Sequence, residues 1–197
     1  MATYFFRAQG RGFDAEVIRT VAALGHEVGY HYESVTQARG DLERARALFA
    51  RDLARLRECA PVKVASMHGS PLLPWDNREI WARATPADFG LLGEVYRDID
   101  YRVVHYISDT GRTWHPTRFN VRDHPPTPTE EVVETTPELI DLVRSGRWPR
   151  LCILAHPERW PASLVEWGMS LARDAATNVV KVALARAYAR LGRSVSR

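Results

Sequence analysis

The chain has 197 residues, of which 45% are hydrophobic and 26% are charged, a composition typical of a globular protein with a substantial core. The formal net charge is +3, and the arginines are spread along the chain instead of forming basic runs between aromatics, which argues against nucleic-acid binding. No apolar run is long enough to span a membrane and no signal segment opens the chain, so we predict a cytoplasmic protein.

The first half of the chain alternates between strand-like and helix-like segments. Residues 1–7 form an aromatic and apolar run that is typical of a strand buried on both faces. Asp14 is a candidate N-cap for the first helix, and Gly25 stands where a helix commonly ends. A strand to His31, a helix from about Gln37 to Cys59 and a strand to His68 follow. This β-α-β-α-β order predicts parallel strands.

The second half shows weaker periodicity, and we find no linker or internal repeat in it. The expected elements are a strand over Tyr101–Ser108, a weak strand over Phe119–Arg122, a helix from about Thr136 to Gly146, a strand to His156, and an amphipathic helix from Ala162 to about Leu191. We therefore expect one α/β domain over residues 1–197, with a C-terminal helix at about 162–191.

Three strand-like runs each end on a histidine: His31, His68 and His156. Along a strand, alternate side chains share a face, so His31 and Glu33 should point the same way. Any one of these histidines alone is best explained as structural. Three in equivalent positions at the carboxyl ends of strands favour a metal or acid/base site.

Several short motifs occur in a characteristic order. They are Ala2–Phe6, Gly25–Glu33, Met67–Pro71, Asp76–Arg78, Ser108–Trp114 and His156–Trp160. Together they resemble the polysaccharide deacetylase (NodB-homology) family, carbohydrate esterase family 4, over residues 1 to about 160. The resemblance implies a distorted (β/α) barrel and a hydrolase that removes N-acetyl groups from an amino sugar or polysaccharide, in surface-glycan assembly. It also implies a divalent metal cofactor, usually zinc.

The resemblance assigns the metal site unevenly. His31 matches the first metal-binding histidine of the family. The second family histidine falls at Val35, so we expect His68 to replace it, with Glu33 as a further candidate ligand.

The other site residues follow from the same resemblance. His156 matches the histidine that protonates the leaving amine, and Asp109 and Arg112 match the group that tunes it, although Asp109–Gly111 could equally form a simple turn. Substrate contacts are expected from Asp76, Asn77, Arg78 and Trp114.

The main departure from the family lies at the front of the chain. The Asp-Asp motif belongs on a strand before Ala2–Phe6 and does not occur in this sequence. We therefore expect an N-terminally truncated barrel that binds metal weakly and that either self-associates through the open edge of its first strand or is only marginally stable. One alternative is a non-catalytic remnant that binds a glycan or a protein partner. Another, favoured if the three histidines lie far apart, is an unrelated α/β metal hydrolase.

Overall fold

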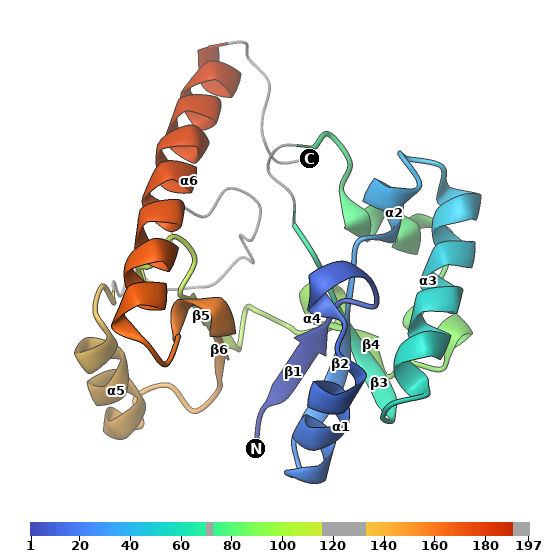
Figure 1. The fold of residues 1–197 in the computed structure, drawn as a ribbon, viewed down its shortest axis with the longest axis horizontal. Coiled ribbons are helices and arrows are strands. Elements are labelled where there is room, and N and C mark those ends of the chain that lie inside the picture. Colours follow the sequence, from blue (N-terminus) through green and yellow to red (C-terminus); the bar gives the residue numbers. More distant parts are fainter. Residues whose placement is uncertain (70–72, 116–132, 191–197) are drawn as a thin grey trace. The chain divides into compact units, whose positions relative to one another are not determined.

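The computed structural model describes residues 1–69, 73–115 and 133–190, and the chain divides into two compact units, Met1–Ile99 and Asp100–Arg197 (Figure 1). The first unit contains a parallel sheet with the strand order β1-β2-β3-β4, and the second contains a parallel pair, β5 and β6. The predicted α/β class with parallel strands is thus confirmed. A barrel and a single domain stay predictions, and the weak strand expected at Phe119–Arg122 lies outside the described residues.

The first unit follows the predicted alternation of strands and helices. Its strands are β1 (Thr3–Phe6), β2 (Glu27–Tyr32), β3 (Val62–Met67) and β4 (Gly93–Glu94). Its α-helices are α1 (Ala15–Ala23), α2 (Ser34–Gln37), α3 (Leu42–Arg57) and α4 (Val95–Asp98). Its 3₁₀ helices are η1 (Gly10–Gly12), η2 (Asn77–Ala82) and η3 (Pro86–Phe89).

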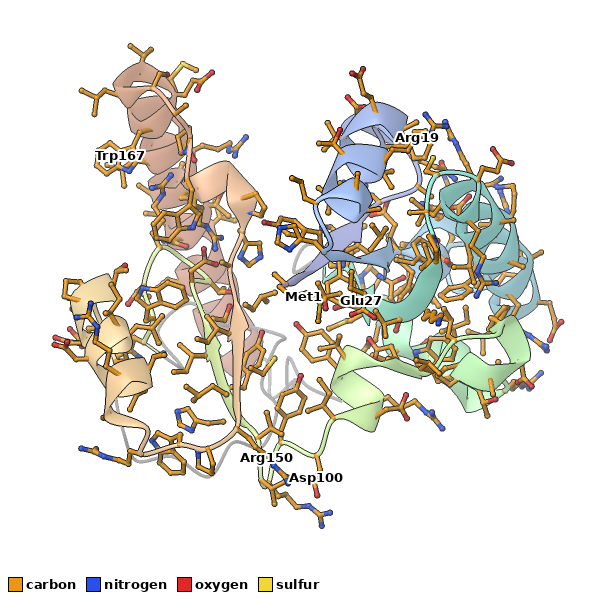
Figure 2. The ribbon with its side chains drawn as sticks, turned by 90° about the horizontal axis from the view of Figure 1, so that it is seen from below. Met1, Arg19, Glu27, Asp100, Arg150 and Trp167 are labelled. Carbon is orange, nitrogen blue, oxygen red and sulfur yellow. The ribbon has the colours of Figure 1, made fainter. Side chains whose placement is uncertain are left out.

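Strand β1 lies at one edge of the described sheet. It runs parallel to β2 with Thr3 opposite Glu27, and Figure 2 labels Met1 and Glu27 at the adjacent starts of the two strands. Thr3 and Tyr4 are exposed and Phe5 is only half-buried, so the expectation of a strand buried on both faces is wrong. An edge strand has one neighbouring strand to cover it, which explains the exposure. Self-association through this edge stays a prediction.

The core of the first unit lies between β2 and α3. Tyr30 and Tyr32 are buried, and their ring centroids lie 4.9 and 5.3 Å from that of Phe49 on α3. On the opposite face of β2, a Cβ added to Gly29 would lie 2.5 Å from the Phe5 ring, so only glycine leaves room for this packing. The alternation of side chains therefore holds the tyrosines in the core and turns His31 to the other face.

The helix expected over residues 37–59 is interrupted. Helix α2 ends at Gln37, and Arg39 and Gly40 take left-handed φ values of 55° and 88°. Asp41 then caps α3, accepting a hydrogen bond from the Arg44 backbone N–H at 3.0 Å. The left-handed pair stops the first helix, and the aspartate starts the second.

Residues 100–115 and 133–190 of the second unit form a short sheet and helices of both the α and 3₁₀ types. Its elements are β5 (His105–Ser108), α5 (Thr136–Ser145), β6 (Leu151–Leu154), η4 (Pro157–Arg159) and α6 (Leu164–Arg190). Strand β5 begins four residues later than expected because the Val103 and Val104 N–H groups donate to the Asp100 carbonyl, forming a turn. Helix α5 is capped by Thr135 and ends at Gly146, whose φ is 61°.

Helix α6 does not bury the apolar face that its sequence suggests. The expected stripe is exposed: Leu164 88%, Trp167 46%, Leu171 40% and Val179 70%. Between Leu164 and Val180 the half-buried positions are instead Ser170, Asp174 and Asn178, which hydrogen-bond within the second unit. Across the described residues, no helix has both the length and the apolar composition needed to cross a membrane.

Candidate functional site

The carboxyl ends of β2 and β3 bring two of the predicted histidines together. The rings of His31 and His68 have centroids 5.1 Å apart and are perpendicular to one another. Because the two strands are parallel and His31 pairs with Ser66, His68 follows β3 at the same edge of the sheet. The predicted convergence of His31 and His68 is confirmed.

Glu33 is the third member of this cluster. Its carboxylate forms ion pairs with Arg7 through Oε1 and with His68 Nδ1 through Oε2, the latter at 3.3 Å. Gln37 Nε2 donates to the same carboxylate at 3.2 Å. The hydrogen bond from His68, followed by those from Arg7 and Gln37, lowers the pKa of Glu33 to about 2 against the opposing effect of burial. Glu33 is therefore a carboxylate at any physiological pH.

Both imidazoles are oriented through Nδ1. His31 Nδ1 lies 3.1 Å from the Ser66 carbonyl, which can only accept, so this nitrogen carries the proton. His68 Nδ1 faces the Glu33 carboxylate in the same way. In the neutral rings the lone pair is then on Nε2, which is the arrangement of metal-binding histidines with a supporting carbonyl or carboxylate.

The cluster offers fewer ligands than a metal site needs. Within residues 1–69, 73–115 and 133–190, no group of three or more His, Cys, Asp or Glu side chains is placed to hold a metal ion. Glu33 is instead observed as the partner of His68 and Arg7. Two imidazoles suit zinc chemically, but these side chains as arranged do not complete a site.

The Asp76–Arg78 motif organises the loop beside this cluster. Asp76 caps η2 through the Arg78 backbone N–H, and its carboxylate also pairs with the Arg78 guanidinium at 2.6 Å. Asn77 is buried, 2% exposed, and its amide bonds to Thr36 and to the His68 carbonyl. The observed role of Asn77 is thus to hold His68, and substrate contact by this motif stays a prediction.

We expect the substitution Asn77→Ala to lower the free energy of unfolding by about 2 kcal/mol, because the Thr36 N–H and the His68 carbonyl lose their partner in a half-buried place. Urea unfolding followed by tryptophan fluorescence measures this. Glu79→Ala, an exposed neighbour on η2, is the matched control and should change little. Equal midpoints for Asn77→Ala and wild type would contradict this role.

The second unit contains a separate cluster around His156. The Asp109 carboxylate accepts from His156 Nδ1 at 2.5 Å through Oδ1 and from the His156 backbone N–H at 3.0 Å through Oδ2. Arg159 Nη1 lies 2.6 Å from the same Oδ1 and 2.7 Å from the Asp109 carbonyl. Burial acts to raise the pKa of Asp109, but the hydrogen bonds from His156 and the nearby positive charges lower it overall. Asp109 is therefore an ionised partner for the imidazole.

The remaining predicted residues of this unit have supporting positions. Arg112, with φ 60°, directs its guanidinium to Asp174 at 2.8 Å and to Ser170 at 2.6 Å, not to Asp109. Trp114 is 7% exposed in the core with Ile107, and its indole N–H donates to Thr136. Its observed role is packing, and contact with a substrate stays a prediction.

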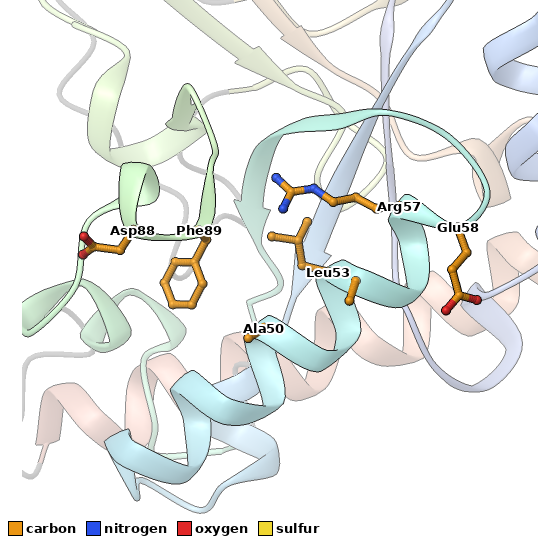
Figure 3. Close-up of a pocket in the computed structure, with 7 residues that line it drawn as sticks. Ala50, Leu53, Arg57, Glu58, Asp88 and Phe89 are labelled. Atoms are coloured by element: carbon orange, nitrogen blue, oxygen red, sulfur yellow. The ribbon is translucent and has the colours of Figure 1, made fainter.

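A groove of about 540 Å³ lies elsewhere in the first unit, between α3 and η3 (Figure 3). It is lined by Ala50, Leu53, Ala54, Arg57, Glu58, Asp88 and Phe89. Arg57 donates to the Val62 carbonyl at the start of β3, whereas His68 follows the other end of that strand. The groove is therefore not part of the histidine cluster.

Several residues of the two clusters have no assignment from the sequence. Arg7 contacts Glu33 from the segment after β1, Gln37 contacts it from the end of α2, and Asp174 contacts Arg112 from α6. The sequence does offer a signal for Arg159, which stands three residues after His156 and inside the His156–Trp160 motif. Gln37 stands four residues after Glu33, a local spacing on a helix. Arg7 and Asp174 carry no local signal, because their partners are 26 and 62 residues away and are set by packing.

Comparison of the chain with protein-family models, with curated proteins and with solved structures gives no match. The resemblance to the polysaccharide deacetylases therefore remains a prediction from the motifs.

Proposed function

We propose that this protein is a deacetylase-like hydrolase that removes N-acetyl groups from an amino sugar or polysaccharide, with a divalent metal, most simply zinc, as cofactor. The observation that carries the proposal is the His156–Asp109 pair, in which an ionised carboxylate holds Nδ1 of a one-third exposed imidazole. Such a pair is suited to transferring a proton at Nε2. The motif order and the paired imidazoles of His31 and His68 add support.

In this proposal each residue has a defined task. Within the first unit, His31 and His68 would hold a divalent ion, and Glu33 keeps His68 in the required tautomer. A divalent ion bound there would polarise the amide carbonyl and lower the pKa of water from 15.7 to roughly 7. Within the second unit, protonated His156 would give its Nε2 proton to an amide nitrogen as water adds to the carbonyl carbon, loses a proton to solvent and the C–N bond breaks, and Asp109 would stabilise the imidazolium. The products are acetate and a free amino sugar.

The direct test is release of acetate from tri-N-acetylchitotriose by the purified full chain, with and without added zinc. Acetate release that stops on adding a zinc chelator supports the proposal. Binding of the trisaccharide without any acetate release, seen by calorimetry, would instead support the glycan-binding alternative. Release that is unaffected by removal of metal would contradict the assigned cofactor.

We expect the chain to bind zinc weakly and Glu33→Gln to bind it about 10-fold to 100-fold more weakly still, because the substitution removes the carboxylate that orients His68. Calorimetric titration with zinc chloride measures both affinities. Glu43→Gln is the control, since the Glu43 side chain is 72% exposed on α3. Equal affinities for wild type and Glu33→Gln would remove Glu33 from the proposed site.

A further inference from the structure

Helix α6 presents a polar stripe to its own unit. Ser170, Asp174 and Asn178 follow at intervals of four residues, so they share one face of the helix. Asn178 Nδ2 donates to the Gly111 carbonyl at 3.0 Å, and Ser170 accepts from Arg112 at 2.6 Å. A helix that docks on a domain ordinarily does so through apolar side chains. Helix α6 instead docks through polar side chains on the turn that carries Asp109.

Asp174 is the charged member of that stripe, and it binds two arginines. Its Oδ2 lies 2.8 Å from Arg112 Nε and 3.4 Å from Arg159 Nε. The three side chains are only 12–16% exposed, so Asp174 offsets the charge of Arg112 and shares with Asp109 the compensation of Arg159. Trp167, labelled in Figure 2, lies on the same helix with its ring centroid 5.8 Å from the Arg112 guanidinium carbon. The arginines are thus held from α6.

The contacts at His156 make this charge balance important. Arg159 Nη1 lies 2.8 Å from His156 Nδ1, while the Asp109 carboxylate lies on the same nitrogen at 2.5 Å. The ionised Asp109 carboxylate can only accept, so Nδ1 donates to it at 2.5 Å, and Arg159 Nη1 donates to the same Oδ1 at 2.6 Å. A guanidinium this close opposes the charging of the imidazole. Asp174 is the only described carboxylate other than Asp109 that binds Arg159.

The charged groups around His156 can be stated for each neighbouring element. The turn after β5 supplies Asp109 and Arg112, η4 supplies Arg159, and α6 supplies Asp174. The two negative charges of these carboxylates balance the two positive charges of the guanidiniums. The other charged described side chains near that end of α6, Glu166 and Arg173, are exposed.

We propose that Asp174 is a positioning residue for His156: it fixes Arg159 and Arg112 and offsets their charge, so that the imidazole keeps its Nδ1 bond to Asp109 and can become positively charged. Its catalytic meaning rests on the proposed function, in which His156 delivers a proton. Its effect on the histidine itself does not depend on any activity.

The test is titration of the histidine side chains by ¹H–¹⁵N NMR in the full chain, with His156 assigned from His156→Gln. We expect Asp174→Asn to lower the pKa of His156 by about half a pH unit or more, because an uncompensated guanidinium then faces the ring. Asp174→Glu keeps the charge and should restore most of the wild-type value. Glu166→Gln removes an exposed charge from the same helix and should change nothing.

A second pair of variants separates charge compensation from simple anchoring of α6. Ser170→Ala with Asn178→Ala removes two anchoring bonds without removing charge and should leave the pKa of His156 unchanged. Arg159→Gln removes the guanidinium beside the ring and should raise the pKa of His156. This variant keeps the test valid if Asp174→Asn fails to fold. An equal shift in the Ser170/Asn178 double variant, or no rise in Arg159→Gln, would overturn the proposal. If the shifts occur but His156→Gln still releases acetate, the proposed function fails and this inference stands.

Discussion

Substitution of Asp109 by asparagine is expected to lower the rate of acetate release from tri-N-acetylchitotriose by roughly 10²–10⁴-fold. Asp109 accepts from both His156 Nδ1 and the His156 backbone N–H, and it also accepts from Arg159. An asparagine has one acceptor and one donor in place of two acceptors, so at least one of these three donors would face an N–H₂ group. The imidazole would then lose its fixed tautomer and the charge that stabilises its protonated form.

The matched control is Asp141→Asn, which removes an equally charged group from α5 in the same unit, where the Asp141 side chain is 79% exposed. It should keep wild-type activity. The measurement is the initial rate of acetate release at saturating substrate, with folding of each variant checked by circular dichroism. A folded Asp109→Asn variant within a few-fold of the wild-type rate would mean that His156 does not act through this carboxylate.

The free energy of unfolding is expected to fall as pH rises from about 4.5 to about 7, by at most about 3 kcal/mol, through Glu94. This side chain is 1% exposed, and burial raises its pKa from 4.5 to about 7 although the Met67, Tyr96 and Arg97 N–H groups donate to it. Below pH 4.5 the carboxyl is protonated in both states. Between 4.5 and 7 only the unfolded chain releases the proton, so stability is progressively lost.

Urea unfolding at several pH values between 4.5 and 8 measures this slope. Glu94→Gln removes the titrating group and should flatten it, whereas Glu79→Gln, at an exposed site on η2, should not. Glu33 acts in the opposite direction and in another range: its folded pKa of about 2 makes its contribution present above 4.5 and lost as pH falls toward 2. A wild-type stability that is constant from pH 4.5 to 7 would show that Glu94 is not held protonated by the fold.

Local signals in the sequence predicted much of the secondary structure. Asp14 caps α1 as expected, and Gly25 and Gly146 end their helices with φ values of 82° and 61°. The apolar positions from Ala45 to Leu56 became the buried face of α3. These predictions succeed because caps, left-handed glycines and helical periodicity depend on residues within one or two turns of each other.

The candidate site was predictable only in part. The convergence of His31 and His68 was predicted correctly from two parallel strands that each end on a histidine. The prediction succeeds because register and side-chain alternation are properties of the sheet. The sequence alone did not reveal that Glu33 forms an ion pair with Arg7. Nor did it reveal that Asn77 is buried and donates a hydrogen bond to the His68 carbonyl. Both depend on loops whose path is determined by contacts with the rest of the unit.

The sequence by itself determined the α/β class, the parallel strands and the ends of α1 and α5, but not the break between α2 and α3. Only the tertiary structure decided that β1 lies at the edge of the sheet formed by the described residues, with Thr3 and Tyr4 exposed, and that α6 docks through Asp174 instead of through its apolar stripe. The physical reason is the sequence separation over which each kind of interaction acts. Caps and periodicity act over a few residues, whereas the burial of a strand face or the pairing of Arg112 with Asp174, 62 residues away, depends on which surfaces the folded chain brings into contact.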